Sequence, residues 1–478
     1  MKAKKELFNL KENGTTVRTE IIAGVTTFMT MAYILVLNPN ILTNYGLEGK
    51  ELWNGAFLAT CIASAIGTFV MAFLTNKPIA MAPGMGLNTV FAAVTAGITA
   101  ITGMTYLQSF QAMLAVVFLE GSLFIILSLL KVREKIIEAI PLGIRLGISP
   151  AIGMLLLDIG FGSNVSIYSE KGGPFYAMRD FFGALTSGSA REQIGSQYNE
   201  MLLSVITIIL GLVVIIALEH RKAKSSILIG IAVSAVFYWI LEAAVLGRNP
   251  FDAARFGSFI PPFGDMASTT LFKLNFAGLA QIGFAAVASL VISLCIVDLF
   301  DTIGMLVGAA SRAGMLDKDG MVPKMREALL SDAIGTVAGS LTGTSTVSSY
   351  VESAAGVSAG GRTGLTSVVT GILFLLSMFI SPVMAVIPAA ATSPALIYVG
   401  ILMLANLKML DFSDLTQIIP IGIMMLAMPI TGSIGNGIGL ALIFYTIIML
   451  VTGRAKKLPV LTYVLTAVFA CKFFALGI

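Results

Sequence analysis

The sequence predicts an all-α polytopic membrane protein with about fourteen transmembrane segments, arranged as two inverted repeats of seven spans. Three observations support this fold class. The 478 residues are 56% hydrophobic and only 12% charged, whereas soluble proteins carry about 25% charged residues. The apolar residues gather into segments of roughly 20 residues, the length that a helix needs to cross a bilayer. Short motifs of the first half also recur, in the same order, in the second half.

The predicted spans fill most of the chain and leave no room for a separate soluble catalytic domain. Each is expected to be helical, because an open strand cannot satisfy its backbone hydrogen bonds in lipid. The spans are 20–37, 55–74, 79–98, 108–130, 139–160, 201–218, 225–243, 279–308, 328–341, 346–360, 365–381, 383–406, 414–451 and 459–477. The run 414–451 is long and contains Pro420 and Pro429, so a single crossing, a double crossing and a re-entrant segment all stay open.

The charged first nineteen residues lack the cleavage pattern of a signal peptide and are predicted to form a cytoplasmic tail. With the N-terminus inside, the loops expected inside hold seventeen Lys and Arg residues and those expected outside hold eight. This asymmetry is the one that the positive-inside rule describes, so the net charge of +4 requires no nucleic-acid partner. The eight are Lys50, Lys77, Lys171, Arg179, Arg191, Arg248, Arg255 and Lys273. After residue 410 the agreement ends, because Arg454 would lie outside if 414–451 crosses once.

An internal repeat relates the two halves. Ser64-Ala65-Ile66-Gly67-Thr68 recurs as Asp332-Ala333-Ile334-Gly335-Thr336, and a stretch rich in small residues follows each copy. Aligning these stretches places Asn88 opposite Glu352, and two further landmarks follow in the same order. Because each copy holds an odd number of spans, the second copy must insert upside down, as in many secondary transporters.

Two segments within spans are poor continuous helices. Residues 81–88 contain a proline and two glycines, and residues 343–350 are small, polar and β-leaning. Interrupted backbone at membrane depth is tolerated only where it faces protein or a watery cavity. We therefore expect two short extended stretches, each followed by a half-helix whose N-terminus faces a central site; the alternative is ordinary membrane-helix glycine and proline.

Acidic residues within the spans are the candidate chemical groups. Asp298 and Asp301 are three residues apart and share a helix face, where each is expected to take up a proton, pair or accept hydrogen bonds. Glu352, at the start of the second half-helix, can accept hydrogen bonds from the N–H groups of a flat heterocycle. The alternative is a purely structural role: a structural pair for Asp298 and Asp301, and a helix cap for Glu352.

Four further residues carry weaker signals. Asn88 supplies a donor and an acceptor at the matching place in the first repeat. Tyr350 could stack on or hydrogen-bond a flat ring, or simply pack. For Glu120 a structural hydrogen bond between helices is favoured at least as strongly as a functional role. His220 lies in a basic loop and is expected to be solvated.

Signatures of enzymes and of metal or cofactor sites are absent from the sequence. Cys61, Cys295 and Cys471 are far apart and form neither a disulfide framework nor a metal site. No P-loop is present, and the G-x-G of APGMGLN lacks the third glycine of a dinucleotide-binding motif. We expect no cofactor and no metal.

Several motifs together resemble the nucleobase/cation symporters, also called the nucleobase–ascorbate transporter superfamily, and within it the hypoxanthine–adenine–guanine permease branch. They are LNPNIL (37–42), APGMGLNTVFA (82–92), SLCIVDLFDTIGMLVGAASRAGML (293–316), SDAIGTVAGSLTGTSTVSSYVESAAGVSAGGRTGLTS (331–367) and VIPAAATSP (386–394). The resemblance spans nearly the whole chain.

The resemblance implies two domains. A core of spans 1–4 and 8–11 (20–135 and 279–382) would hold substrate between strands in spans 3 and 10. A gate of spans 5–7 and 12–14 (136–246 and 383–478) would form a homodimer interface, with an extracytoplasmic loop at 247–278.

The resemblance also implies roles for individual residues. Asn88, Asp298 and Glu352 would grip a purine, beside Gly86, Leu87 and Tyr350. Asp301 would be a second required acid, and Asp298, Asp301 and Glu352 would couple to protons. Other branches of the superfamily have Glu and His in the eighth span, where this chain has Asp298 and Asp301. This departure disfavours uracil or xanthine as the substrate.

The implied function is import of guanine or hypoxanthine, and by extension adenine, with a proton across the cytoplasmic membrane. A uracil or xanthine permease is the first alternative. An inorganic anion transporter of the sulfate type is the second, although its site would favour positive charge. A channel or scaffold without coupling is the third.

Overall fold

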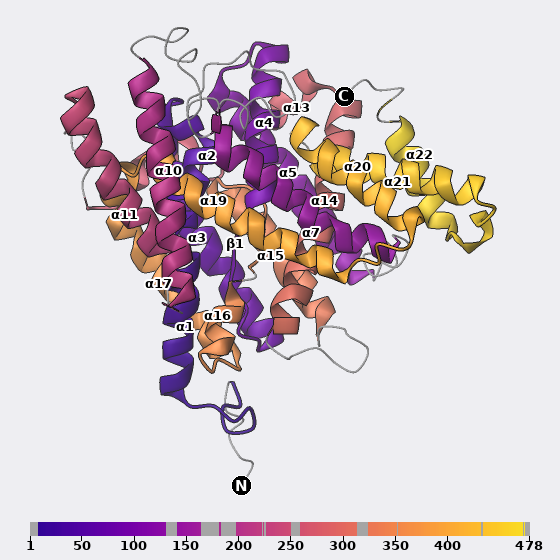
Figure 1. Ribbon diagram of the computed structural model, residues 1–478, viewed down its shortest axis with the longest axis horizontal. Helices are drawn as coiled ribbons and strands as arrows, with labels where there is room; N and C mark the ends of the chain where they lie inside the picture. Colours follow the sequence, from indigo (N-terminus) through magenta and orange to yellow (C-terminus); the bar gives the residue numbers. More distant parts are fainter. Residues whose placement is uncertain are drawn as a thin grey trace. The chain divides into compact units, whose positions relative to one another are not determined.

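The computed structural model describes residues 8–130, 141–163, 181–182, 197–221, 223, 226–249, 259–312, 324–350, 352–431, 434–471 and 473. Helices dominate these residues (Figure 1). In the first half the elements are α1 (Val17–Met31), α2 (Ile34–Leu42), η1 (Asn44–Gly46), α3 (Lys50–Thr75), β1 (Met81–Pro83), α4 (Met85–Thr102), α5 (Tyr106–Leu129), α7 (Leu142–Asp158), η2 (Ile159–Ser163), α10 (Gln197–His220), α11 (Ser226–Leu241) and η3 (Glu242–Leu246). Most of the stretch between the predicted spans 139–160 and 201–218 lies outside the described residues.

The second half follows the same scheme. Its elements are α12 (Phe263–Thr269), α13 (Phe276–Ile282), α14 (Phe284–Arg312), α15 (Met325–Thr342), β2 (Val347–Ser349), α16 (Ser353–Ser358), α17 (Gly364–Leu376), η4 (Ser377–Ile380), α18 (Ser381–Ala385), α19 (Ala389–Leu404), η5 (Ala405–Met409), α20 (Leu415–Thr431), α21 (Ile434–Val451), η6 (Ala455–Lys457) and α22 (Val460–Cys471).

The helices confirm a multi-pass membrane protein. Within the described part of the chain, 8 helical segments are long and apolar enough to cross a membrane, and the bent pair α13 and α14 adds a ninth. Four shorter apolar helices fall in the last predicted spans. Each of the fourteen predicted spans contains at least one helix, and the run 414–451 is divided into α20 and α21, which pack against each other.

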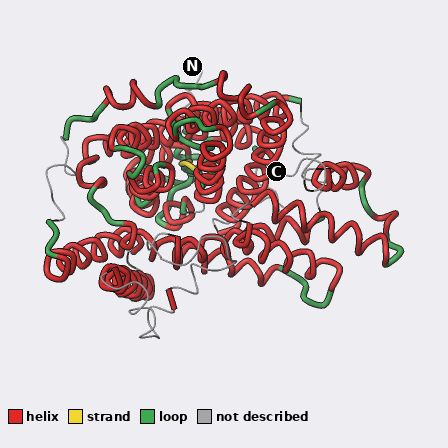
Figure 2. Tube along the Cα trace, turned by 90° about the horizontal axis from the view of Figure 1, so that it is seen from above, coloured by secondary structure: helices red, strands yellow, loops and turns green. Residues whose placement is uncertain are grey.

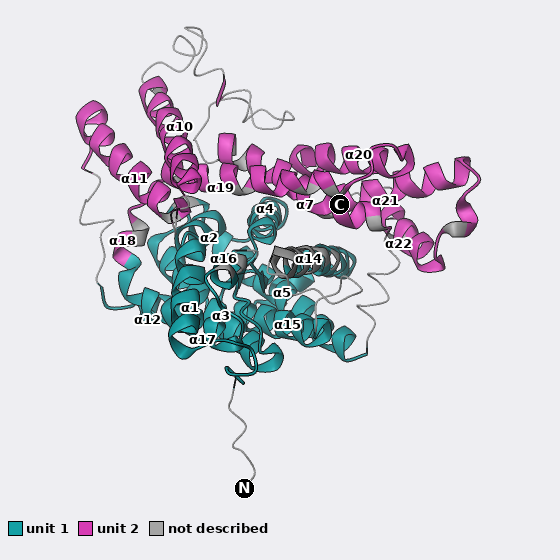
Figure 3. Ribbon diagram, turned by 60° about the horizontal axis from the view of Figure 1, so that its bottom comes forward, with its two compact units in different colours: residues 1–137, 258–381 teal, residues 138–257, 382–478 magenta. Residues whose placement is uncertain are grey.

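The chain divides into two compact units (Figure 3). Unit 1 comprises Met1–Ile137 and Ser258–Ser381, and unit 2 comprises Glu138–Gly257 and Pro382–Ile478. Each unit therefore takes one segment from each half of the sequence. Unit 1 also includes α12, which packs on α3, where the Asn54 side chain donates to Asp265 Oδ2 at 2.6 Å.

One element of the predicted topology needs correction. The Asn76 side chain, at the end of α3, donates to the carbonyl oxygen of Phe8 at 3.2 Å, and the ring of Phe8 stacks on Phe73. The turn after α3 therefore lies beside the N-terminal segment. The placement of Lys77 on the opposite side from the N-terminus is wrong, because α1, α2 and α3 together lead out and back.

Two short strands pair near the centre of unit 1, and Figure 2 shows them in yellow among the helices. β1 and β2 are antiparallel, with Met81 opposite Ser349, Ala82 opposite Ser348 and Pro83 opposite Val347. Two inverted copies of one unit must run their equivalent strands in opposite directions, so this pairing agrees with the predicted inverted repeat.

The repeated motif explains how the strands are supported. In each copy the threonine hydroxyl donates to the carbonyl of the first strand residue: Thr68 to Met81 at 3.1 Å and Thr336 to Val347 at 3.4 Å. The two glycines lie where α3 crosses α15, and a Cβ on Gly335 would lie 3.5 Å from the Cα of Gly67.

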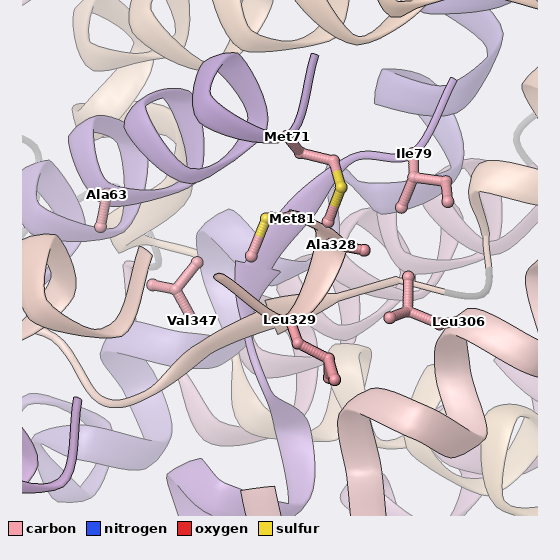
Figure 4. Packing of buried hydrophobic residues seen from close by; sticks show 8 residues of the cluster. All are labelled: Ala63, Met71, Ile79, Met81, Leu306, Ala328, Leu329 and Val347. Atoms are coloured by element: carbon pink, nitrogen blue, oxygen red, sulfur yellow. The ribbon is translucent and has the colours of Figure 1, made fainter. Parts of the chain in front are cut away.

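An apolar cluster fills the space around these strands (Figure 4). Its buried members include Met81 of β1 and Val347 of β2, together with Ala63, Met71, Ile79, Leu306, Ala328 and Leu329. The strand pair thus rests on a packed interior of unit 1, which fixes the position of the residues that follow each strand.

Candidate functional site

The strand pair brings together the two interrupted segments that the sequence predicted. α4 begins at Met85, directly after β1, and α16 begins at Ser353, shortly after β2. Hydrogen bonds from Gly84 N to Thr346 O and from Tyr350 N to Ala80 O, both 3.0 Å, continue the pairing at its two ends. The polar residues that follow the two strands therefore lie at the two ends of one short strand pair.

Asn88 joins the two repeats directly. Its side chain is fully buried, and Oδ1 accepts a hydrogen bond from the Ser345 hydroxyl. Its amide nitrogen, Nδ2, makes no hydrogen bond in the described structure. An amide donor without a partner costs free energy when buried, so Asn88 is suited to donate to a ligand.

Glu352 immediately precedes α16, as expected, and is half-buried. One of its carboxylate oxygens, Oε1, accepts a hydrogen bond of 2.7 Å from the hydroxyl of Tyr33. Sequence reasoning missed Tyr33, because nothing in the local pattern of the first span points to a residue 319 positions away.

The strand register refines the alignment of the repeats. Glu352 lies three residues after the end of β2, and Gly86 lies three residues after the end of β1. Gly86, rather than Asn88, therefore corresponds to Glu352. Gly86, Leu87 and Asn88 are all buried in the first turn of α4, and the Gly86 carbonyl accepts from the Thr89 hydroxyl at 2.8 Å.

The hydroxyl of Tyr350 bonds to the protein. It donates to the carbonyl of Pro83 at 2.5 Å, and the side chain is only 1% exposed. This bond ties the residue after β2 to the last residue of β1. Of the two functional uses expected for Tyr350, hydrogen bonding by the hydroxyl is thus taken up by β1.

Asp298 is fully buried on α14, which packs against β2, α16 and α4. The Thr302 hydroxyl lies 3.4 Å from Asp298 Oδ1 and 2.8 Å from Oδ1 of Asp332, a second fully buried carboxylate. Asp332 belongs to the repeated motif, yet the sequence analysis did not assign it a site role. The side chain of Asp301 lies outside the described residues.

Three consecutive residues before β2 are each held by a different helix. Thr344 accepts from the Asn38 side chain of α2 at 2.8 Å, and Ser345 donates to Asn88 of α4. Thr346 donates to Glu120 Oε2 of α5 at 3.1 Å. Glu120 thus accepts a hydrogen bond from the segment between α15 and β2, and the path of the chain into β2 is fixed.

The assembled site offers carboxylate acceptors and an amide donor in buried surroundings. No group of three or more His, Cys, Asp or Glu that could hold a metal occurs in the described part of the chain. Such a set of groups can recognise a small polar molecule by complementary hydrogen bonds.

The comparisons with known proteins agree along nearly the whole length. The model of the permease family matches residues 18–437. A putative permease of Methanocaldococcus jannaschii is 40% identical over 99% of this chain and 98% of its own. Adenine permease AdeQ of Escherichia coli is 35% identical over 98% of this chain and 95% of its own. Guanine/hypoxanthine permease PbuO of Bacillus subtilis is 35% identical over 98% of this chain and 100% of its own.

Solved structures share the fold at low sequence identity. The transmembrane domain of the cyanobacterial bicarbonate transporter BicA superposes with a TM-score of 0.58 at 16% identity, covering 89% of this chain and 97% of its own. SLC26A9 superposes with a TM-score of 0.55 at 12% identity, covering 91% of this chain and 66% of its own. From the family match and the full-length relatives, the chain belongs to the permease family of nucleobase–ascorbate transporters, as its motifs predicted.

Proposed function

We propose that this protein imports purine nucleobases, namely guanine, hypoxanthine or adenine, across the cytoplasmic membrane together with protons. The names of the relatives at about one-third identity support the substrate class, since they are adenine and guanine/hypoxanthine permeases. A uracil or xanthine substrate is the alternative that competition must exclude.

The observation that carries the proposal is that one polar residue stands shortly after each of the two paired strands. Glu352 presents a carboxylate after β2, and Asn88 presents an unpartnered buried amide after β1. A purine carries ring N–H donors and ring nitrogen or carbonyl acceptors on its edge. We assign Glu352 to the ring N–H groups and Asn88 to an acceptor on the ring, with Asp298 as a further contact.

Proton coupling is assigned to Asp298, Asp301 and Glu352. The burial of Asp298 supports the assignment, because an ionised carboxylate away from water is costly unless it is paired, hydrogen-bonded or neutralised. The hydroxyl of Thr302 lies between Asp298 and Asp332, so a proton on one carboxylate is linked by hydrogen bonds to the other.

The transport cycle that we propose is alternating access. Unit 1, which carries the site, would act as the core, and unit 2 would act as the gate and form a homodimer interface. The N-terminus would lie in the cytoplasm. The likeness to bicarbonate and SLC26 transporters supports the fold alone, and carboxylates in the site disfavour an anionic cargo.

The experiment is uptake of labelled hypoxanthine by a strain without purine permeases of its own. Unlabelled guanine and adenine are expected to compete, whereas xanthine, uracil, sulfate and bicarbonate are not. Glu352→Gln should abolish uptake while leaving the protein in the membrane, and an uncoupler should abolish accumulation. Uptake that persists in Glu352→Gln contradicts the site, and accumulation that survives the uncoupler contradicts proton coupling.

A further inference from the structure

Tyr33 lies where the first membrane-crossing segment is interrupted between α1 and α2. The backbone tightens there, since Leu35 N bonds to Ala32 O and Val36 N bonds to Tyr33 O, both at 3.2 Å and three residues apart. The Tyr33 side chain is 1% exposed, and its hydroxyl donates to Glu352 Oε1 at 2.7 Å. The break in the span thus directs a buried phenol at the proposed substrate carboxylate.

The helix that begins directly after Tyr33, α2, bonds the other end of the segment that contains β2. Asn38, five residues after Tyr33, donates from Nδ2 to the Thr344 hydroxyl at 2.8 Å and to the Thr60 hydroxyl at 2.7 Å. In the sequence, Thr344 precedes β2 and Glu352 follows it. Asn38 of α2 therefore bonds the interrupted segment before its strand, and Tyr33, which immediately precedes α2, bonds it after its strand.

We infer that Tyr33 is a positioning residue that orients the carboxylate of Glu352 for the purine; this inference rests on the proposed function. A glutamate side chain has three rotatable bonds, the last of which is only weakly restricted. A phenol bonded to one carboxylate oxygen restricts that side chain before the purine binds, and this lowers the conformational entropy lost on binding. A carboxylate has about four lone-pair sites, so acceptance from Tyr33 is compatible with acceptance from ring N–H groups.

The test compares Tyr33→Phe with Tyr106→Phe in the full-length protein. Tyr106 is a matched control, because its hydroxyl also makes one hydrogen bond within unit 1, of 2.8 Å to the carbonyl oxygen of Leu42. That bond lies away from the pair of strands β1 and β2. Tyr33→Phe is expected to raise the KM for hypoxanthine uptake, and the Kd of the purified protein for hypoxanthine, about tenfold. The maximal rate and the melting temperature without ligand should match those of Tyr106→Phe.

A second variant, Tyr33→Met, fills a similar volume without a hydroxyl and should give the same rise in KM. Unchanged KM and Kd in both variants overturn the inference. So does loss of thermal stability or of membrane insertion in both variants while Tyr106→Phe stays intact, because the hydroxyl then maintains the fold. Failure of the proposed function looks different: the wild-type protein itself would bind and import no purine base.

Discussion

At the scale of single residues, buried carboxylates with specific partners organise unit 1. Glu20 in the first turn of α1 is fully buried and accepts from the backbone N–H groups of Arg362, Thr363 and Thr366 at 2.9, 3.3 and 3.1 Å. The hydroxyls of Thr363 and Thr366 add bonds of 2.8 and 2.7 Å. Glu20 therefore caps α17, since a negative charge at a helix N-terminus is stabilised by the free N–H groups there.

Replacing Glu20 by alanine should destabilise the protein strongly. The change leaves several buried donors at the start of α17 without an acceptor, and we expect a loss of about 3 kcal/mol. Thermal denaturation of the purified protein in detergent measures it. The control is Glu51→Ala, an exposed residue in the first turn of α3. Equal melting temperatures of the two variants would show that the cap contributes little.

Asp298 provides a residue-scale prediction on coupling. Asp298→Asn keeps the shape and the hydrogen bond to Thr302 but can neither gain nor lose a proton near neutral pH. Exchange of labelled for unlabelled hypoxanthine in proteoliposomes should continue, whereas a proton gradient should no longer drive accumulation. The exposed residue Asp411 serves as the control, and Asp411→Asn should accumulate normally. Gradient-driven accumulation by Asp298→Asn would remove Asp298 from the coupling mechanism.

At the scale of elements, the short repeated motif proves to be the support of the strand pair. Its glycines let α3 and α15 approach beneath β1 and β2, and its threonines bond the first residue of each strand. The first position of the motif differs between copies. The Ser64 hydroxyl has no hydrogen-bond partner in the described part of the chain, whereas Asp332 accepts from Thr302. The two copies thus keep the same residues where the helix backbones pack closely, and they differ at a position whose polar group lies beside Asp298 of the proposed site.

Gly335→Val should therefore disturb the position of the strands β1 and β2, which carry the proposed site. A Cβ at Gly335 would lie only 3.2 Å from Met81 Cε and 3.3 Å from Val347 Cγ1. Valine would add two further methyl groups to this close contact. We expect a stability loss of about 1–3 kcal/mol and loss of hypoxanthine binding. Gly97→Val is the control, since a Cβ at Gly97 meets no atom within 4 Å. Equal binding and stability of the two variants would argue against a tight crossing.

At the scale of the whole molecule, the membrane orientation depends on which loops share a side. The contact between Asn76 and Phe8 places the turn after α3 with the N-terminal segment, and the Ser367 hydroxyl donates to the Lys77 carbonyl at 2.9 Å. Moving Lys77 to the inner side increases the excess of basic residues there, as the positive-inside rule requires.

Cysteine labelling tests this orientation. In a background with the exposed Cys471 replaced by serine, Lys11→Cys and Lys77→Cys should react with a membrane-impermeant maleimide only after the cells are permeabilised. Glu48→Cys, in the exposed turn before α3, should react in intact cells. Labelling of Lys77→Cys together with Glu48→Cys would contradict the shared side, and labelling of Lys11→Cys in intact cells would reverse the proposed orientation.

The sequence by itself determined the membrane class, the spans, the inverted repeat and the interruptions at 81–88 and 343–350. These features are local: span length follows from the thickness of the bilayer, and proline, glycine and small polar residues interrupt a helix wherever they stand. The tertiary structure alone decided that Tyr33 reaches Glu352, that Asp332 shares the hydroxyl of Thr302 with Asp298, and that Gly86 is the counterpart of Glu352. The partner of a buried polar group depends on which helices, distant in the sequence, pack together. A local sequence pattern does not contain that information.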